Sequence, residues 1–219
     1  MNKWRLAVWV GLVGMFMLGC GKKAVVHKYY VIELPDLPLH RELQKPMRPE
    51  AVCEILPVTI SSAFAGRRIA IREKNYEISY FVYHQWASPP AEIMTSLVEK
   101  FMLNAAIFGE VSGEAWRSLP DYRIKGYVHQ LEVRKEKGKF VAHLHMDLFL
   151  IDTEKRQAVV QYSFDRYQPL ARKDLDEFAG AISTMLKQGL SDFSKKIRAY
   201  FKRLELPQSV GETITPESR

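Results

Sequence analysis

Cysteine is scarce in this sequence, which contains only Cys20 and Cys53 in 219 residues. If one of the two is modified, no intramolecular disulfide can form, and stability must come from a hydrophobic core. Cys53 lies in a strand-like apolar pattern, 52–55, without a basic neighbour that would lower its pKa. This setting predicts a buried, inert thiol and argues against a cysteine nucleophile.

The motifs of common hydrolases and nucleotide-binding proteins are also absent. The sequence has no G-x-S-x-G, S-x-x-K or H-E-x-x-H motif and no glycine-rich Walker loop. Basic residues are interspersed with acidic ones, as at 134–137, and neither zinc-finger spacing nor an aromatic RNA-binding signature accompanies them. We therefore predict that the chain is not an enzyme, does not hydrolyse nucleotides and does not bind nucleic acid.

The N-terminus is the most informative segment that is present. Lys3 and Arg5 precede the uncharged apolar run Leu6–Leu18, which is followed by Gly19 and Cys20. This order is typical of a secretory signal peptide. About 15 apolar residues at a rise of 1.5 Å are too short for a hydrocarbon core about 30 Å thick, so we favour a cleaved signal over a transmembrane anchor.

Because a cysteine follows the small residue, the segment resembles the lipobox of bacterial lipoproteins, in which that thiol is acylated before cleavage. Met17-Leu18 is a loose version of the residues usual at those two positions. We predict a signal peptide at residues 1–19, lipid attachment at Cys20 and a lipidated tether at 20–27. The diacylglycerol and acyl chains on Cys20 would be covalent additions, and no other cofactor is expected.

Lipidation would hold the protein in the cell envelope, since several acyl chains on one residue anchor more firmly than one. Loss of Lys3 and Arg5 with the signal lowers the formal charge from +7 to +5, which suits a position near anionic lipid. Gly21 stands where an aspartate marks inner-membrane retention in enteric bacteria. This resemblance to sorted lipoproteins favours the outer membrane, with the protein facing the periplasm.

The body of the protein, residues 28–204, alternates strand patterns with two helical ones. We predict strands at residues 28–34, 51–60, 68–72, 76–83, 122–133, 139–151 and 159–167, with a short further segment at 107–111. One amphipathic helix is expected to begin after Ser88 as N-cap, and a longer one to cover Asp174–Leu204. Residues 205–219 are polar and read as a disordered tail.

This order predicts an α+β fold. It is a two-layer sandwich of a mixed, mostly antiparallel β-sheet with the two main helices packed on one face. We expect turns at 73–75 and 135–138, and a proline-punctuated loop that includes Pro46 and Pro49 and cannot form an interior strand. Alternate residues of the strand 139–151 are apolar and would face the helices.

The other face of that strand carries His143, His145 and Asp147. If Val128 in the neighbouring strand faces Leu144, His129 faces His143, and three imidazoles with one carboxylate could hold zinc. The alternative is the solvent-facing side of an antiparallel sheet. We favour this alternative, and expect no metal, because the spacing lacks the compact pairs of dedicated sites.

Aromatic residues gather before the first helix, where Tyr80, Tyr83 and Trp86 could line a groove for a lipid or a partner. Core packing beneath the helix explains the same residues equally well. The apolar stripe of the long C-terminal helix likewise has two possible roles. It could pack only on its own sheet or also on a second subunit, so a homo-oligomer stays open.

Several segments together resemble a known family. They are the lipobox cysteine, the tyrosine-rich strand 28–34, the run Tyr80-Phe81-Val82-Tyr83-His84-Gln85-Trp86-Ala87-Ser88-Pro89-Pro90, and Asp121-Tyr122-Arg123-Ile124. The chain is similar, over roughly residues 29–204, to the ABC-type transport auxiliary lipoproteins, which include the PqiC-like (YmbA-like) lipoproteins. Residues 41–49 and the tail after 206 lie outside the resemblance.

The resemblance implies a non-catalytic docking or scaffold subunit with Cys20 as its lipid attachment. Its expected partners are an Mce-type (MlaD-like) periplasmic protein and an ABC permease and ATPase that move phospholipids or other hydrophobic molecules. A second hypothesis is a periplasmic lipid carrier with its own hydrophobic cavity. A third, remote one is a metal-dependent envelope enzyme that uses His129, His143 and His145.

Replacement of the predicted lipid attachment residue tests the anchor directly. We expect Cys20→Ser to abolish incorporation of labelled palmitate and to release the domain from the membrane fraction, because no acyl chain can then be attached. The matched variant Cys53→Ser should keep both properties. Undiminished labelling of the Cys20→Ser protein would contradict the lipobox interpretation.

Overall fold

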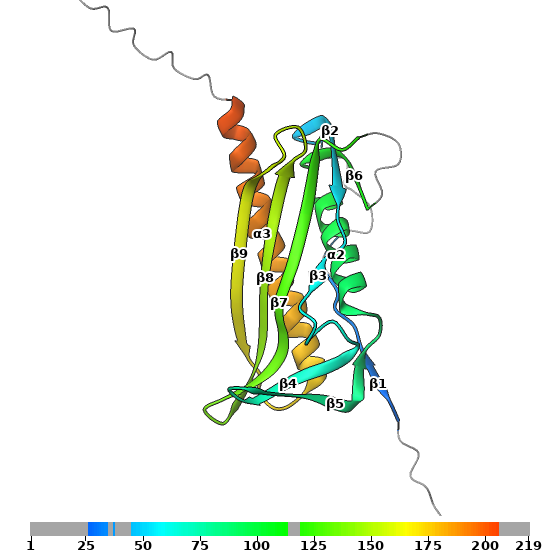
Figure 1. The fold of residues 1–219 in the computed structure, drawn as a ribbon, viewed down its shortest axis with the longest axis vertical. Coiled ribbons are helices and arrows are strands. Elements are labelled where there is room, and N and C mark those ends of the chain that lie inside the picture. Colours follow the sequence, from blue (N-terminus) through cyan, green and yellow to red (C-terminus); the bar gives the residue numbers. More distant parts are fainter. Residues whose placement is uncertain (1–25, 35–36, 38–44, 114–118, 206–219) are drawn as a thin grey trace, which may run out of the picture.

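The computed structural model describes residues 26–34, 37, 45–113 and 119–205 (Figure 1). The predicted signal peptide, Cys20, Gly21 and nearly all of the predicted tail lie outside the described residues. The strands are β1 Lys28–Tyr30, β2 Arg48–Ile55, β3 Thr59–Ile60, β4 Arg68–Lys74, β5 Glu77–Trp86, β6 Phe108–Ser112, β7 Tyr122–Glu136, β8 Lys139–Asp152 and β9 Gln157–Pro169. The helices are α2 Pro90–Asn104 and α3 Leu175–Glu205.

The strands form one mixed sheet around β7, which confirms the predicted α+β class. Along one edge β7 pairs in parallel with β2, then β3, then β4, and along the other edge it pairs antiparallel with β8 over nearly its whole length. β9 extends the sheet beyond β8, and β5 beyond β4. Parallel β1 and β6 complete the arrangement at the outer edges of β5 and β2.

Both helices cover one face of this sheet, as predicted. α3 packs across β8 and β9, and α2 lies against β2, β3 and β6 (Figure 1). The alternating apolar residues of β8 are buried beneath α3, where they meet the apolar stripe of that helix. All members of the predicted stripe are buried: Phe178, Ile182, Met185, Leu186, Gly189, Phe193, Ile197 and Phe201. Of the helices that the structure describes, neither has both the length and the apolarity to cross a membrane.

Proline positions explain two differences from the predicted strands. The expected single strand 51–60 is divided into β2 and β3 around Pro57, which has no backbone N–H for the ladder with β7. Pro49, expected in a loop, lies near the start of β2, where the pairing with β6 is irregular between Arg48 and Val52. An irregular ladder tolerates a missing donor there.

Local contacts explain the other differences. The first helix has Pro89 at its N-cap with no side-chain cap bond, so the predicted capping by Ser88 is wrong, and Pro90 occupies the first helical position. The β4–β5 turn is formed by residues 75–76 and not by 73–75, because Lys74 pairs with Glu77. The first strand ends at Tyr30, although Ile32 and Leu34 beyond it are buried.

The β7–β8 turn is where it was predicted. Lys137 and Gly138 both have positive φ, 49° and 82°, and connect the paired residues Glu136 and Lys139. Two positive φ angles in a two-residue loop match the right-handed twist of the flanking strands.

Two glycines of α3 give a matched test of the packing between α3 and β9. A Cβ at buried Gly189 would lie 2.4 Å from the ring of Phe164, whereas one at exposed Gly180 would meet nothing within 4 Å. We expect Gly189→Ala to lower the free energy of unfolding by about 1–3 kcal/mol through overpacking. Gly180→Ala should raise it by about 1 kcal/mol through helix propensity alone. Urea unfolding followed by circular dichroism measures both, and equal effects would contradict the close contact.

Candidate functional sites

The face of the sheet opposite the helices carries the predicted histidine cluster, but in a different register. Val128 pairs with Met146, not with Leu144, so the predicted pairing of His129 with His143 is wrong. The ladder shifts between Val128 and Gln130, where His129 is an extra residue. A bulge of this kind places two successive residues opposite one partner residue, and the sequence pattern gave no sign of it.

His143 belongs to a buried polar group around Glu132. The Glu132 side chain is fully buried and accepts hydrogen bonds from Arg72 Nε on β4 at 2.9 and 3.0 Å. The His143 ring lies between two carboxylates, with Nδ1 3.5 Å from Glu132 and Nε2 2.7 Å from Asp165. Burial alone would raise the pKa of Glu132, but hydrogen bonds from His143 and Arg72 outweigh it and lower that pKa.

His129 and His145 instead meet at Asp147. His129 Nε2 lies 2.6 Å from Asp147 Oδ2, and His145 Nε2 lies 4.0 Å from Oδ1 of the same carboxylate. The two imidazole rings are stacked, with centroids 4.4 Å apart and planes inclined at 26°. The structure thus divides the three predicted histidines: two form this cluster and His143 forms another.

The three aromatic residues predicted to line a groove, Tyr80, Tyr83 and Trp86, have different surroundings in the structure. Trp86 is almost fully buried and packs on Phe178 of α3, with ring centroids 5.7 Å apart. Tyr80 is half-buried, donates a hydrogen bond to the carbonyl of Ala63 at 3.0 Å and lies beneath the Arg68 guanidinium. These two residues support the core, whereas the third, Tyr83, does not.

Tyr83 stands on a large bulge of β5. Ala70 of β4 pairs with Tyr80 and Arg68 pairs with Gln85, so residues 81–84 of β5 stand opposite Ile69 alone. Two side chains of the bulge are exposed, Val82 by 65% and Tyr83 by 45%. The neighbouring strand β1 adds Tyr29, whose partner in the ladder is Gln85 and which is exposed by 58%. We call Tyr29, Val82 and Tyr83 the β5 edge surface.

Two side chains that the sequence analysis missed hold this region in place. Arg67 donates hydrogen bonds to the carbonyls of Trp86 and Ala87 at 3.0 and 2.8 Å, which fixes the passage from β5 to α2. The Tyr30 hydroxyl lies 2.8 Å from Nδ1 of His84 and joins β1 to the bulge. Neither contact follows a short spacing in the sequence, so pattern reasoning had no signal for it.

Cys53 is fully buried in β2, as predicted from its apolar surroundings. Burial raises the pKa of its thiol far above the ordinary range, and the nearby Glu54 carboxylate adds to that effect. A thiol held in this neutral form is a poor nucleophile.

The family model for the ABC-type transport auxiliary lipoprotein component matches residues 34–192 of this chain, which is most of its length. The chain belongs to this family. The matched residues include β5 with its bulge, the Glu132 group and the His129 cluster. No curated protein matches the chain significantly.

Solved structures are similar to the chain in fold. Protein XCC0632 from Xanthomonas campestris superimposes with a TM-score of 0.63 at 15% identity, over 76% of this chain and 94% of that one. A second solved structure, of an uncharacterized protein, gives a TM-score of 0.62 at 13% identity, over 78% of this chain and 99% of the other. At such low identities these similarities establish the fold alone.

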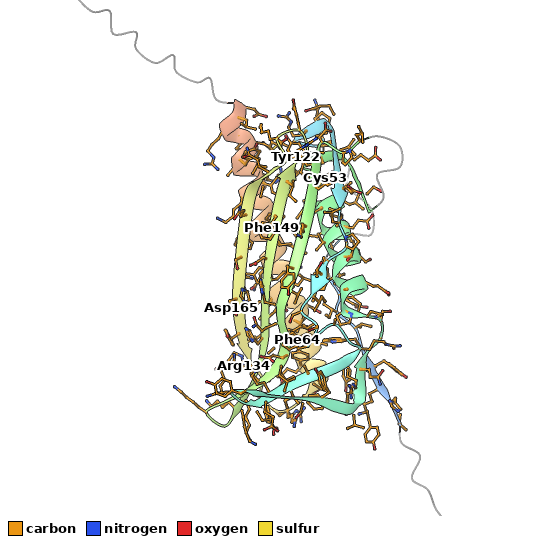
Figure 2. All side chains as sticks on the ribbon, viewed as in Figure 1. Cys53, Phe64, Tyr122, Arg134, Phe149 and Asp165 are labelled. Carbon is orange, nitrogen blue, oxygen red and sulfur yellow. The ribbon has the colours of Figure 1, made fainter. Side chains whose placement is uncertain are left out.

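The arginine that pairs with buried Glu132 gives a sharp test of the polar group, whose member Asp165 on β9 is labelled in Figure 2. Because Glu132 would be left buried without its guanidinium partner, we expect Arg72→Ala to lower the free energy of unfolding by about 3–5 kcal/mol. Lys74→Ala on the same strand removes an exposed ion pair with Glu77 and should have little effect. Chemical denaturation measures both. Similar values for the two variants would contradict the importance of the buried pair.

Proposed function

We propose that this protein is a lipid-anchored docking subunit of an Mce-type ABC transport system that moves phospholipids or other hydrophobic molecules. The observation that carries the proposal is its membership of the transport auxiliary lipoprotein family. An auxiliary subunit needs a membrane attachment and a surface for the other subunits, and it needs no catalytic machinery of its own. Its partners in this proposal are the Mce-type (MlaD-like) protein and the ABC permease and ATPase.

The position of the β5 edge surface supports this role. The described chain begins at Val26 and enters β1, which pairs with β5 at one end of the elongated domain, whereas α3 ends at the opposite end (Figure 1). Cys20 precedes Val26 by six positions, so the acylated residue would lie within about 20 Å of that end even with a fully extended tether. The β5 edge surface thus lies on the membrane-proximal part of the domain in this proposal, with the outer membrane as the proposed site of anchoring.

Exposed aromatic and aliphatic side chains suit contact with a protein partner. Aromatic residues are enriched at the centres of protein interfaces. Val82 and Tyr83 project from a bulge whose backbone is free of the β4 ladder, and bulges aim side chains in directions that a regular strand does not allow.

The filled core favours docking over the carrier hypothesis. A carrier would need space for acyl chains between the sheet and its helices, but large buried side chains occupy that layer. Phe108, Tyr122 and Phe201 form a mutual ring cluster there, with centroids 5.3–5.9 Å apart. Two depressions on the described surface are open and have charged rims. One of about 400 Å³ is bordered by Arg48, Glu50 and Asp152, and one of about 520 Å³ beside α3 is bordered by Glu33, Asp176 and Lys187. Charged side chains at both rims oppose the burial of an acyl chain.

The proposal is tested by affinity capture of the full chain from detergent-solubilised membranes of its own cells. We expect the native protein to recover an Mce-type protein together with ABC subunits. Val82→Glu should reduce that recovery at least tenfold, because a charge in the centre of an apolar contact remains unpaired there. Leu204→Glu at the far end of α3 changes a residue that is 52% exposed, and should recover the partners normally.

Each outcome bears on a different part of the proposal. Absence of Mce-type and ABC subunits from the native capture would refute the function. Normal recovery by Val82→Glu would refute the docking surface alone. A stoichiometric phospholipid found by mass spectrometry in the purified protein would favour the carrier hypothesis.

A further inference from the structure

We propose that His129, His145 and Asp147 form a binding site for a divalent transition metal ion, with Zn²⁺ as the expected ion. Each residue offers one ligand atom, and the three atoms lie within 4.8 Å of one another. Two imidazoles and one carboxylate form a donor set that Zn²⁺ uses in proteins. Neither family membership nor the docking role calls for such a site.

The distances suit an ion after a small adjustment. Ligand atoms 2.0–2.2 Å from a tetrahedral ion lie about 3.3–3.6 Å from one another. Here Asp147 lies 2.6 Å from His129 Nε2 and 4.0 Å from His145 Nε2, one value below that range and one above it. Binding requires the first distance to lengthen by about 0.7 Å and the second to shorten by about 0.4 Å, and it requires the two stacked rings to turn so that both Nε2 lone pairs meet at one point. Binding of the ion through Nε2 requires the His129 tautomer that carries its proton on Nδ1, so the contact between His129 Nε2 and Asp147 gives way to a bond from each residue to the ion.

The bulge in β7 creates this arrangement. In a regular ladder the side chains of successive residues point to opposite faces, so His129 and Gln130 could not both lie beside β8 on the outer face. The extra residue in β7 lets His129 reach Asp147 while Gln130 stays opposite His145. A bulge conflicts with the otherwise regular pairing of these long strands, and placing a ligand is one reason for a fold to contain it.

The neighbours of the cluster orient its ligands as the surroundings of metal sites do. Gln130 Oε1 lies 2.8 Å from His145 Nδ1 and, as an acceptor, selects the tautomer whose Nε2 lone pair points toward Asp147. Ser163 on β9 forms a side-chain hydrogen bond with Asp147 and so helps to orient its carboxylate. Tyr127 packs edge-on against His129, with ring centroids 4.6 Å apart.

Access and charge also suit an ion. The three side chains are 34%, 29% and 25% exposed, which leaves an open position for water or for a ligand from another molecule. Asp147 lies within hydrogen-bonding distance of His129 and supplies a carboxylate oxygen, which is a ligand that Zn²⁺ accepts. His143 is excluded from the site, because both of its ring nitrogens face carboxylates of the other group.

The test is calorimetric titration of the full chain, purified without a polyhistidine tag, with ZnCl₂ in the presence of a competing chelator. We expect one ion per chain. His145→Asn and Asp147→Asn should each weaken binding at least tenfold, and Gln130→Leu about 10–100-fold, as is usual for a residue that orients a ligand. His27→Asn replaces an exposed histidine outside the cluster and should bind as the native chain does.

A second measurement separates binding from folding. Circular dichroism of the metal-free variants checks that each is folded. Zn²⁺ at 100 times its dissociation constant should raise the melting temperature of the native chain by about 5–10 °C, and that of the Asp147→Asn variant by much less.

Absence of saturable Zn²⁺ binding to the native chain would overturn the proposal. Equal affinities for the native chain and for folded His145→Asn and Asp147→Asn variants would do the same. Either result would leave the docking function untouched, because the capture experiment depends on the β5 edge surface and not on the cluster on β7 and β8.

Discussion

The fold depends on the hydrogen bonding of β7 along both of its edges. One edge receives β2, β3 and β4 in sequence, and the other receives β8 through a long antiparallel ladder. A strand that is paired on both edges and buried on the helix-facing side cannot slip by one residue without turning Ile124, Leu131 and Val133 to the wrong face. The positions of both polar groups on the outer face follow from this fixed register.

The sheet separates two kinds of surface. On the helix side, apolar side chains from β8 and α3 fill the layer and stabilise the domain without a disulfide between described residues. On the other side, carboxylates and imidazoles form groups that span three or four strands, from Arg72 on β4 to Asp165 on β9. Such groups link neighbouring strands at specific positions, whereas apolar contacts would tolerate several alignments. The exposed residues of the β5 edge surface belong neither to the apolar layer beneath the helices nor to the polar groups on the outer face, which suits a separate role in binding a partner.

Regular periodicity made much of the fold predictable. The apolar alternation in β8 and the stripe along α3 depend only on strand and helix periods, so the sequence located both elements and the faces they bury. The β7–β8 turn was predictable because Gly138 favours positive φ. Ser88 was predicted as the N-cap only because serine is common at that position. The helix instead begins after Pro89, and the hydrogen bonds from Arg67 to the carbonyls of Trp86 and Ala87 hold the preceding segment.

By itself, the sequence determined the α+β class, the buried Cys53, the two helices and the family resemblance, because each depends on local composition or period. Only the tertiary structure decided which residues share a site. The bulges in β5 and β7 determine the direction in which Tyr83 and His129 point. Each bulge depends on how its strand pairs with the neighbouring strand. The contacts that result join residues far apart in the chain, such as Arg72 with Glu132 and His129 with Asp147, and no spacing within one segment predicts them.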